Sequence, residues 1–427
     1  MFSLTQFFAS SSRYAGRGLA LASVVALLST PVWAAGNGKF NVTRLVVVGD
    51  SLSAGFQNFS LNETGQLNGY TALVAKQAGL AVNGSQIGPT TFALPLISYP
   101  GIPPALYFAG GQILQNTFPG APEPGGQPSN LSVPGSTVLD ALVHPFPGSP
   151  TTNPIDALSD IVFTRSSIPA CSPIPASHIP FPPVLPIGPT PYVVSQVACA
   201  LALNPSAILV SIGNNDALQS LTLGLPPTDP KIFAVEYAVL LRALSSTGAK
   251  VVVSNVPDVR TIPFLMPFQL FLQRCGVPPS GAGPDDFVVP NLLNPAGGTN
   301  PCTNYAVRSK ALIDAAGAAV ISFNRTIAVQ AQAVGAVVVD VNGRLSTLRA
   351  TGYDVTVNNK KKHLTTEMFG GLFSLDGIHP TNTGYAILAN ATILAINGAL
   401  SKNQPIPEVN VDAVAAVDPL AFPVFVP

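Results

Sequence analysis

Short β-branched runs alternate with longer amphipathic segments over much of this chain. The runs are only five or six residues long and almost purely apolar, as in strands buried on both faces of a parallel sheet. They are Thr43–Val48, Ala207–Ile212, Lys250–Ser254 and Ala336–Asp340. Helical periodicity follows them at 68–78, 231–247, 305–334 and 381–396. The alternation predicts an α/β fold with a doubly wound parallel sheet and helices on both faces.

Two stretches interrupt this pattern. Residues 81–200 are dense in Pro and Gly and hold few periodic segments, apart from a short helical pattern at 130–142. Their apolar content and two cysteines argue against a disordered linker, so we expect a loop-rich cap insertion packed over the core. Residues 256–303 form a second Pro-rich excursion. The main domain would then span 35–400, with 401–427 as a C-terminal tail.

The first 34 residues have the pattern of a secretory signal peptide. Arg13 and Arg17 are positively charged, residues 19–28 are apolar, and Val32 and Ala34 place small residues at a cleavage site. The apolar run is too short to span a bilayer as a mature helix, although an uncleaved N-terminal anchor is the alternative. We therefore expect a secreted or periplasmic protein.

The net charge of the chain limits the classes of binding partner that we expect. Without residues 1–34 the chain has 18 basic and 20 acidic residues, a net charge of about −2. A nucleic-acid partner would require a basic surplus, so none is expected. The run Lys360–Lys362 is most simply a solvated loop, with a peripheral contact to anionic lipid head groups as the alternative. The oligomeric state is not encoded in these features.

Four cysteines occur, namely Cys171, Cys199, Cys275 and Cys302. An even number in an exported chain suggests disulfides, and three pairings are open. The pairing of sequence neighbours would close loops of roughly 28 residues, each stabilising by about 3 kcal/mol. Buried free thiols are the alternative. A metal site is disfavoured because no Cys-x-x-Cys or Cys/His cluster exists.

Polar residues follow two of the expected strands, at Gly49–Ser51 and at 213–216. In open α/β sheets, ligands bind beyond the carboxyl ends of the strands. Ser51 is therefore a candidate nucleophile, which would need a base to take its proton. The alternative is that Ser51 only caps the helix that follows.

His379 is the candidate base. It lies three residues after Asp376, and the intervening Gly377 permits a sharp turn. The carboxylate could then hold Nδ1 of the imidazole and leave Nε2 facing the serine. The alternative is a helix-capping Asp376 beside a surface histidine. The rival histidines lie in the Pro-rich insertion or after the lysine run; they are His144, His178 and His363.

Ester hydrolysis also requires donors for the developing oxyanion. The side chain of Asn215, at a strand end, and the backbone N–H of Ser51 are candidates. Gly135 is a third, because glycine lets a backbone N–H approach a ligand closely. An ordinary type II turn is the alternative for Gly135, and Gly110 and Gly111 are rivals for its role.

Taken together and in this order, these segments resemble the GDSL (SGNH) hydrolase family. The matching blocks are Val48–Gly55, Asn130–Thr137, Gly213–Asp216 and Asp376–Pro380. The resemblance implies a three-layer α/β/α, flavodoxin-like parallel sheet, without a metal or organic cofactor. It also implies roles for the named residues: Ser51 as nucleophile, His379 as general base, Asp376 as its orienting acid, and Ser51, Gly135 and Asn215 as the oxyanion hole.

We therefore expect a secreted serine esterase or lipase that cleaves small or lipid carboxylic esters through a Ser51 acyl-enzyme. An apolar insertion near the site favours acyl-chain substrates. A carbohydrate acetylesterase on the same scaffold and a non-catalytic secreted binding protein are the alternatives. The sequence does not select the natural substrate or the acyl-chain length.

Overall fold

The structure, a computed structural model, describes most of the chain from residue 40 onward. The described residues are 40–84, 86–146, 154–163, 168–175, 192–291, 300–399 and 404–423. The expected signal peptide, 1–34, lies outside them. The division into a main domain, a cap and a tail stays a prediction.

A four-stranded parallel sheet forms the centre, in the order β1-β9-β10-β14. Its strands are β1 (Leu45–Gly49), β9 (Ala207–Ser211), β10 (Lys250–Ser254) and β14 (Val337–Val339). All four expected strands are therefore present, with ends that move by at most two residues. Val46, Val47 and Val48 are fully buried, as a sheet covered on both faces requires.

A fifth segment, 129–133, runs along the free edge of β1. The Val47 N–H donates to the carbonyl of Ser129 (2.9 Å), and the Leu131 N–H donates back to the carbonyl of Val47 (2.9 Å). The Val133 N–H then donates to the carbonyl of Gly49 (3.1 Å). β1 therefore lies between this segment and β9, at the point where the strand order reverses, which is where α/β sheets bind ligands.

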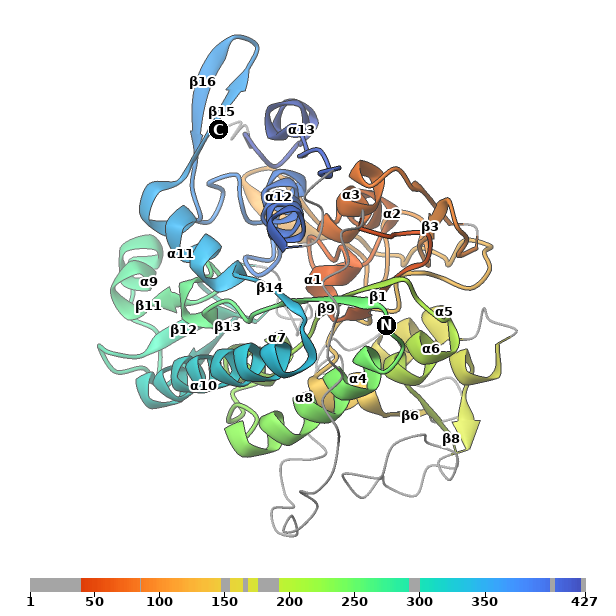
Figure 1. The fold of residues 1–427 in the computed structure, drawn as a ribbon. Helices are drawn as coiled ribbons and strands as arrows, with labels where there is room; N and C mark the ends of the chain where they lie inside the picture. Colours follow the sequence, from red (N-terminus) through yellow and green to blue (C-terminus); the bar gives the residue numbers. More distant parts are fainter. Residues whose placement is uncertain are drawn as a thin grey trace.

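Helices cover both faces of the sheet (Figure 1). One face carries α1 (Ser51–Ala54), α3 (Tyr70–Gln77) and α12 (Asn382–Ala399). The other carries α4 (Val138–Leu142), α6 (Gln196–Ala202), α8 (Pro230–Ser245) and α10 (Lys310–Val334). The predicted three-layer α/β/α architecture is confirmed.

The remaining described elements lie around this core. The helices are α2 (Glu63–Asn68), α5 (Pro154–Phe163), η3 (Pro169–Cys171), α7 (Asn214–Thr222), η5 (Val259–Thr261) and α11 (Val341–Thr351). The strands between β1 and β9 are β2 (Ala81–Asn83), β3 (Thr91–Ala93), β4 (Leu106–Ala109), β5 (Gln112–Gln115), β6 (His144–Phe146), β7 (Ile174–Pro175) and β8 (Tyr192–Val194).

The long helix α10 is shorter than the pattern predicted. Residues Tyr305–Arg308 form strand β13 instead, because they pair with β12 (Phe287–Pro290). The helix begins after Ser309, whose side chain caps the Leu312 N–H. α10 is long and apolar enough to cross a bilayer by length and composition alone. It packs against α7 and α8, and Phe323 stacks on Phe233. The apolar face of α10 is therefore part of the hydrophobic core.

The described part of the excursion at 256–303 contains strands β11 and β12, which form a small antiparallel sheet with the following strand β13, and a helix before β12. β11 is Met266–Pro267 and the helix is α9 (Phe268–Cys275). Both disulfides join sequence neighbours: Cys171 pairs with Cys199, and Cys275 pairs with Cys302. The structure thus selects one of the three pairings that the sequence left open.

The lysine run is not a loop. Lys360–Lys362 belong to strand β16 (Lys360–Leu364), which pairs with β15 (Tyr353–Val357) in a hairpin. The hairpin projects from the body of the molecule (Figure 1). Asn358 and Asn359 both have positive φ, as a two-residue hairpin turn requires. The three lysines are nevertheless exposed, as expected.

The C-terminal segment expected as a tail contains helix α13 (Val411–Val417). It packs against α12 and β15, with Val411 and Ala415 buried. The carboxylate of Asp418 accepts hydrogen bonds from the N–H and hydroxyl of Thr383 (2.8 and 2.7 Å). These contacts tie the C-terminal segment to the start of α12, directly after the block that carries His379.

Candidate active site

Ser51 is the first residue of α1, immediately after β1. The cap of this helix is Asp50, whose side chain accepts the Leu52 N–H (3.1 Å). Ser51 is therefore not the capping residue, and its hydroxyl is available for another partner. The side chain lies just below the surface, since Ser51 is 7% exposed.

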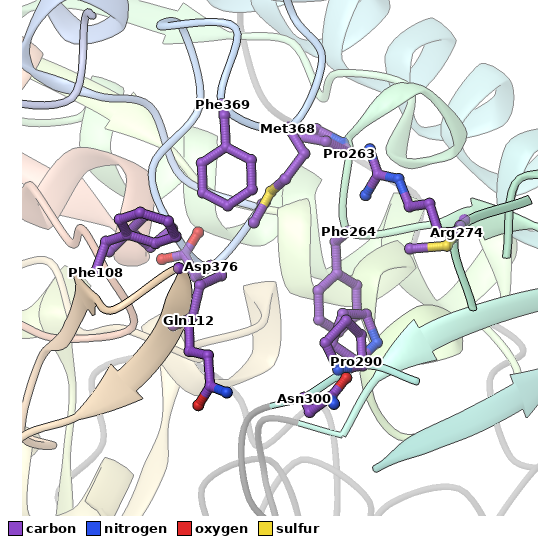
Figure 2. Close-up of a pocket in the computed structure, with 16 residues that line it drawn as sticks. Phe108, Gln112, Pro263, Phe264, Arg274, Pro290, Asn300, Met368, Phe369 and Asp376 are labelled. Atoms are coloured by element: carbon purple, nitrogen blue, oxygen red, sulfur yellow. The ribbon is translucent and has the colours of Figure 1, made fainter. Parts of the chain in front are cut away.

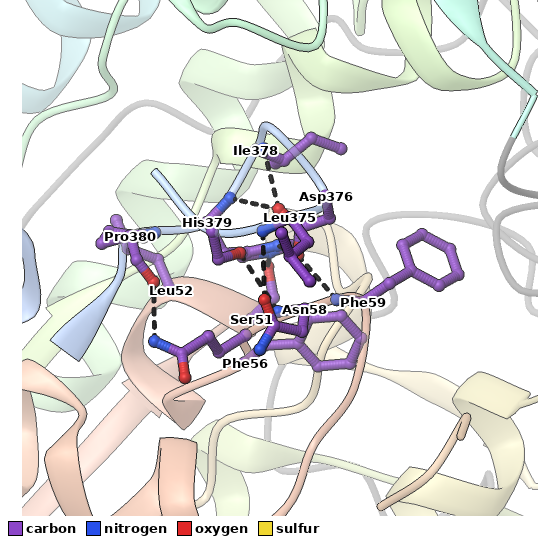
Figure 3. A network of polar contacts seen from close by, with 12 residues as sticks. Ser51, Leu52, Phe56, Asn58, Phe59, Leu375, Asp376, Ile378, His379 and Pro380 are labelled. Carbon is purple, nitrogen blue, oxygen red and sulfur yellow. Dashed lines mark hydrogen bonds and ion pairs between the residues drawn. The ribbon is translucent and has the colours of Figure 1, made fainter. Parts of the chain in front are cut away.

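Ser51, His379 and Asp376 form a continuous hydrogen-bonded chain (Figure 3). The distance from His379 Nε2 to Ser51 Oγ is 2.9 Å, and from His379 Nδ1 to Asp376 Oδ2 it is 3.0 Å. With its Nδ1 proton donated to the carboxylate, the imidazole accepts the serine proton at Nε2. Residues 328 positions apart thus meet at one sheet edge.

Both carboxylate oxygens of Asp376 accept hydrogen bonds. Oδ1 accepts the N–H groups of Ile378 and His379 (both 2.8 Å), and Oδ2 accepts the N–H of Phe59 (2.7 Å). Burial favours the neutral acid, but His379 and these donors outweigh it and lower the pKa of Asp376 below its ordinary value. Asp376 therefore stays ionised, as an orienting carboxylate must.

Gly377 makes this turn feasible. Its φ is 68°, and a Cβ there would lie 2.9 Å from the backbone nitrogen of Phe264. The Phe264 N–H donates to the carbonyl of Gly377 (2.9 Å). The excursion after β10 therefore supports the loop that carries Asp376 and His379.

The three oxyanion candidates follow neighbouring strand ends. Asn215 lies at the start of α7, after β9, and its side-chain amide donates to the carbonyl of Ser136 (2.8 Å). Gly135 has a φ of 88° and follows segment 129–133. Within the described part of the chain, the N–H groups of Ser51 and Gly135 have no hydrogen-bond partner. Backbone N–H donors without a partner are what an oxyanion site requires.

The glycines that rival Gly135 and the histidines that rival His379 have other surroundings. Gly110 and Gly111 form the turn of the β4–β5 hairpin, with open space where a Cβ would be. His144 is buried and pairs with Asp140 (3.1 Å) on α4. His363 pairs with Asp354 (2.7 Å) across the projecting hairpin. The fourth histidine, His178, lies outside the described residues.

Two buried carboxyl groups that the sequence did not single out support the site. Asp50 accepts the side-chain amide of Asn214 (2.8 Å), and burial raises its pKa to about 6. Asp216 accepts the N–H of Val138 (3.0 Å), and burial raises its pKa to about 7. Asp216 thereby holds the chain just after Gly135. The run of polar residues 214–216 after a buried strand was the available signal.

Glu236 on α8 is another buried acid near this region. Burial, with added repulsion from Asp216 and Asp140, raises its pKa from 4.5 to about 9. Between these values the folded state keeps a proton that the unfolded chain has lost. The free energy of unfolding therefore falls as the pH rises through this window.

The variant Glu236→Gln cannot ionise and should escape this loss. We expect its melting temperature to exceed that of the wild type increasingly as the pH rises from 5 to 9, by a few degrees at the upper end. Circular dichroism melts across this range measure the difference. The exposed Glu408→Gln serves as the matched control and should follow the wild type. A Glu236→Gln curve parallel to the wild type would show that Glu236 is already ionised at neutral pH.

No group of three or more His, Cys, Asp or Glu side chains is placed to hold a metal ion within the described ranges. The polar groups gathered at this edge are instead a hydroxyl, an imidazole, a carboxylate and amide donors. Such an arrangement can activate a serine and stabilise an oxyanion.

A family model for "GDSL-like Lipase/Acylhydrolase" matches residues 45–392, well over half of the chain. The chain belongs to this family. Members of the GDSL-like family are ester-hydrolysing enzymes, and the matched range includes every candidate site residue named above. No curated protein matches the chain.

Three solved structures are similar at low identity. LAE5, an alpha/beta hydrolase from the metagenome of Lake Arreo, Spain, is 14% identical and covers 83% of this chain and 95% of its own, with a TM-score of 0.34. TesA is 14% identical, covering 83% and 99%, with a TM-score of 0.34. A putative GDSL-like lipase from Parabacteroides merdae is 12% identical, covering 84% and 98%, with a TM-score of 0.34.

Proposed function

We propose that this GDSL-like hydrolase is an exported serine esterase or lipase that cleaves carboxylic esters through an acyl-enzyme on Ser51. The observation that carries the proposal is the 2.9 Å contact between Ser51 Oγ and His379 Nε2, with Asp376 on the far side of the imidazole. A serine hydroxyl becomes a nucleophile when a neutral imidazole in this tautomer accepts its proton.

The reaction follows from this geometry. Ser51 Oγ attacks the ester carbonyl carbon while its proton passes to His379 Nε2. The carbonyl oxygen becomes an oxyanion that accepts hydrogen bonds from the Ser51 and Gly135 N–H groups and the Asn215 amide. The carbon–oxygen bond to the alcohol breaks, and His379 protonates the departing oxygen. Water, deprotonated by His379, then attacks the acyl-enzyme and releases the carboxylic acid together with Ser51.

Asn215→Ala is expected to lower kcat by about 10²–10³-fold while KM changes little, because an oxyanion donor acts mainly in the transition state. Steady-state kinetics on a 4-nitrophenyl ester measure both constants. The melting temperature should be followed alongside, since the amide also bonds Ser136. A rise in KM at constant kcat would place Asn215 in ground-state binding instead.

The disulfides support export, because such bonds persist in oxidising compartments. A secreted or periplasmic location is therefore part of the proposal. Detection of both disulfides by non-reducing peptide mapping, in protein recovered from the cell exterior or the periplasm, tests it. Fully reduced protein found only in the cytosol would contradict it.

A substrate panel tests the activity. We expect hydrolysis of 4-nitrophenyl esters from acetate to laurate, with a preference for medium chains, and labelling of the folded protein by a fluorophosphonate probe. A preference for acetylated sugars would favour the acetylesterase alternative. Folded protein that neither labels nor hydrolyses any ester would favour a non-catalytic binding role.

A further inference from the structure

An apolar pocket of about 410 Å³ lies beside the loop that carries Asp376 (Figure 2). Three segments far apart in the sequence line it: the β4–β5 hairpin, the excursion after β10 and the loop before His379. Its apolar walls include Phe108, Phe264, Met266, Met368 and Phe369. Pockets of this size commonly hold small ligands.

The pocket adjoins the triad without lying over the nucleophile. Asp376 and Gly377 are part of its lining, whereas Ser51 and His379 are not. The carboxylate of Asp376 is already occupied by the imidazole and by three backbone N–H groups. It keeps its negative charge, but both of its oxygens already have hydrogen-bond partners, so it is not free to pair with a ligand in the pocket.

Among the described residues that line the pocket, one is a cation. Arg274, near the C-terminal end of α9, is exposed, and no acid in the described part of the chain forms an ion pair with it. The adjacent Cys275 is joined to Cys302, which anchors this end of the helix. A guanidinium in such a position matches a carboxylate or phosphate with two parallel hydrogen bonds.

We propose that this pocket binds an anionic amphiphile, with its acidic group on Arg274 and its hydrocarbon chain between the aromatic and methionine side chains. A neutral ligand would leave the guanidinium without an anionic partner, and a cationic ligand could not pair with it. The same chemistry has two sources: a free fatty acid, or the charged far end of an ester substrate. The second source rests on the proposed function.

Direct binding tests the site without turnover. Isothermal titration with decanoate in the Ser51→Ala background should show saturable binding, and decyltrimethylammonium should show none. Adding Arg274→Gln should weaken decanoate binding by about tenfold, the size expected for loss of one partly exposed charge-assisted bond. Adding Arg325→Gln, a change at an exposed arginine of α10, is the matched control and should leave decanoate binding unchanged. Absent binding, or equal binding after Arg274→Gln, overturns the proposal.

Kinetics on the otherwise wild-type enzyme separate the two sources. The probes are the 4-nitrophenyl ester of decanoic acid and the 4-nitrophenyl monoester of decanedioic acid, which carries a terminal carboxylate. A rise in KM for the charged ester alone after Arg274→Gln assigns the site to substrate. Unchanged KM for both esters, with weakened decanoate binding, assigns it to the free acid. An equal rise for both esters contradicts charge recognition.

If neither ester is turned over, the proposed function fails. Decanoate binding to the Ser51→Ala protein is measured without catalysis, so it reports on the pocket in either case. The failure of the pocket proposal and the failure of the hydrolase proposal are therefore distinguishable.

Discussion

Replacing Ser51 by alanine is expected to lower kcat/KM for ester hydrolysis by about 10⁵-fold or more, the largest effect of any single change in this protein. In the proposed mechanism the hydroxyl oxygen forms the acyl-enzyme, and this hydroxyl forms a hydrogen bond with His379. Alanine suits the first turn of a helix, so α1 should remain intact. Initial rates with a 4-nitrophenyl ester, together with the loss of fluorophosphonate labelling, measure the effect.

The matched control is Ser246→Ala, which removes an exposed hydroxyl at the end of α8. It should retain wild-type rates and labelling. Residual activity of Ser51→Ala within tenfold of the wild type, in protein with an unchanged melting temperature, would rule out the acyl-enzyme on Ser51.

Asp376→Asn is expected to lower kcat by about 10³–10⁴-fold, less than the loss of the serine itself. In the wild type, both carboxylate oxygens accept hydrogen bonds. An asparagine must turn its NH₂ group toward some of these donors. If it faces His379 Nδ1, the imidazole proton moves to Nε2, and the ring can no longer accept the proton of Ser51. The nucleophile remains, but its base is in the wrong tautomer.

The surface pair Asp354–His363 provides a control of the same chemistry, because its Oδ1–Nδ1 distance is 2.7 Å and both side chains are exposed. Asp354→Asn should leave kcat unchanged. The pH–rate profile of Asp376→Asn should also differ in shape from that of the wild type. A loss equal to that of Ser51→Ala in folded protein would contradict the ranking.

The four central strands were predictable because each is a short, continuous apolar run rich in β-branched residues, a pattern that needs no knowledge of distant residues. β1 and β9 are buried throughout, whereas β14 at the sheet edge leaves Val338 exposed. The candidate triad was predictable for a related reason. Ser51 follows such a strand directly, and the Asp376–His379 turn is local, with Gly377 at the position that requires positive φ. Local sequence patterns therefore indicated which side chains are candidates, but not that Ser51 and His379 lie in contact.

Other features depend on contacts between distant segments. Residues 129–133 contain no strand pattern, and only their hydrogen bonds to β1 place them along its free edge. Residues 305–308 have helical periodicity, yet pairing with β12 makes them a strand. The lysine run at 360–362 forms a strand for the same reason, since β15 lies opposite.

The sequence alone was enough to predict the central strands, the helices between them and the residues of the candidate triad, because these follow from short-range patterns of burial and turn geometry. Tertiary structure was needed for the cysteine pairing, the place of segment 129–133 beside β1, and the pocket beside Asp376. Each of these depends on which of several compatible segments come together in space, and that choice is made by the packing of the whole chain rather than by any local preference.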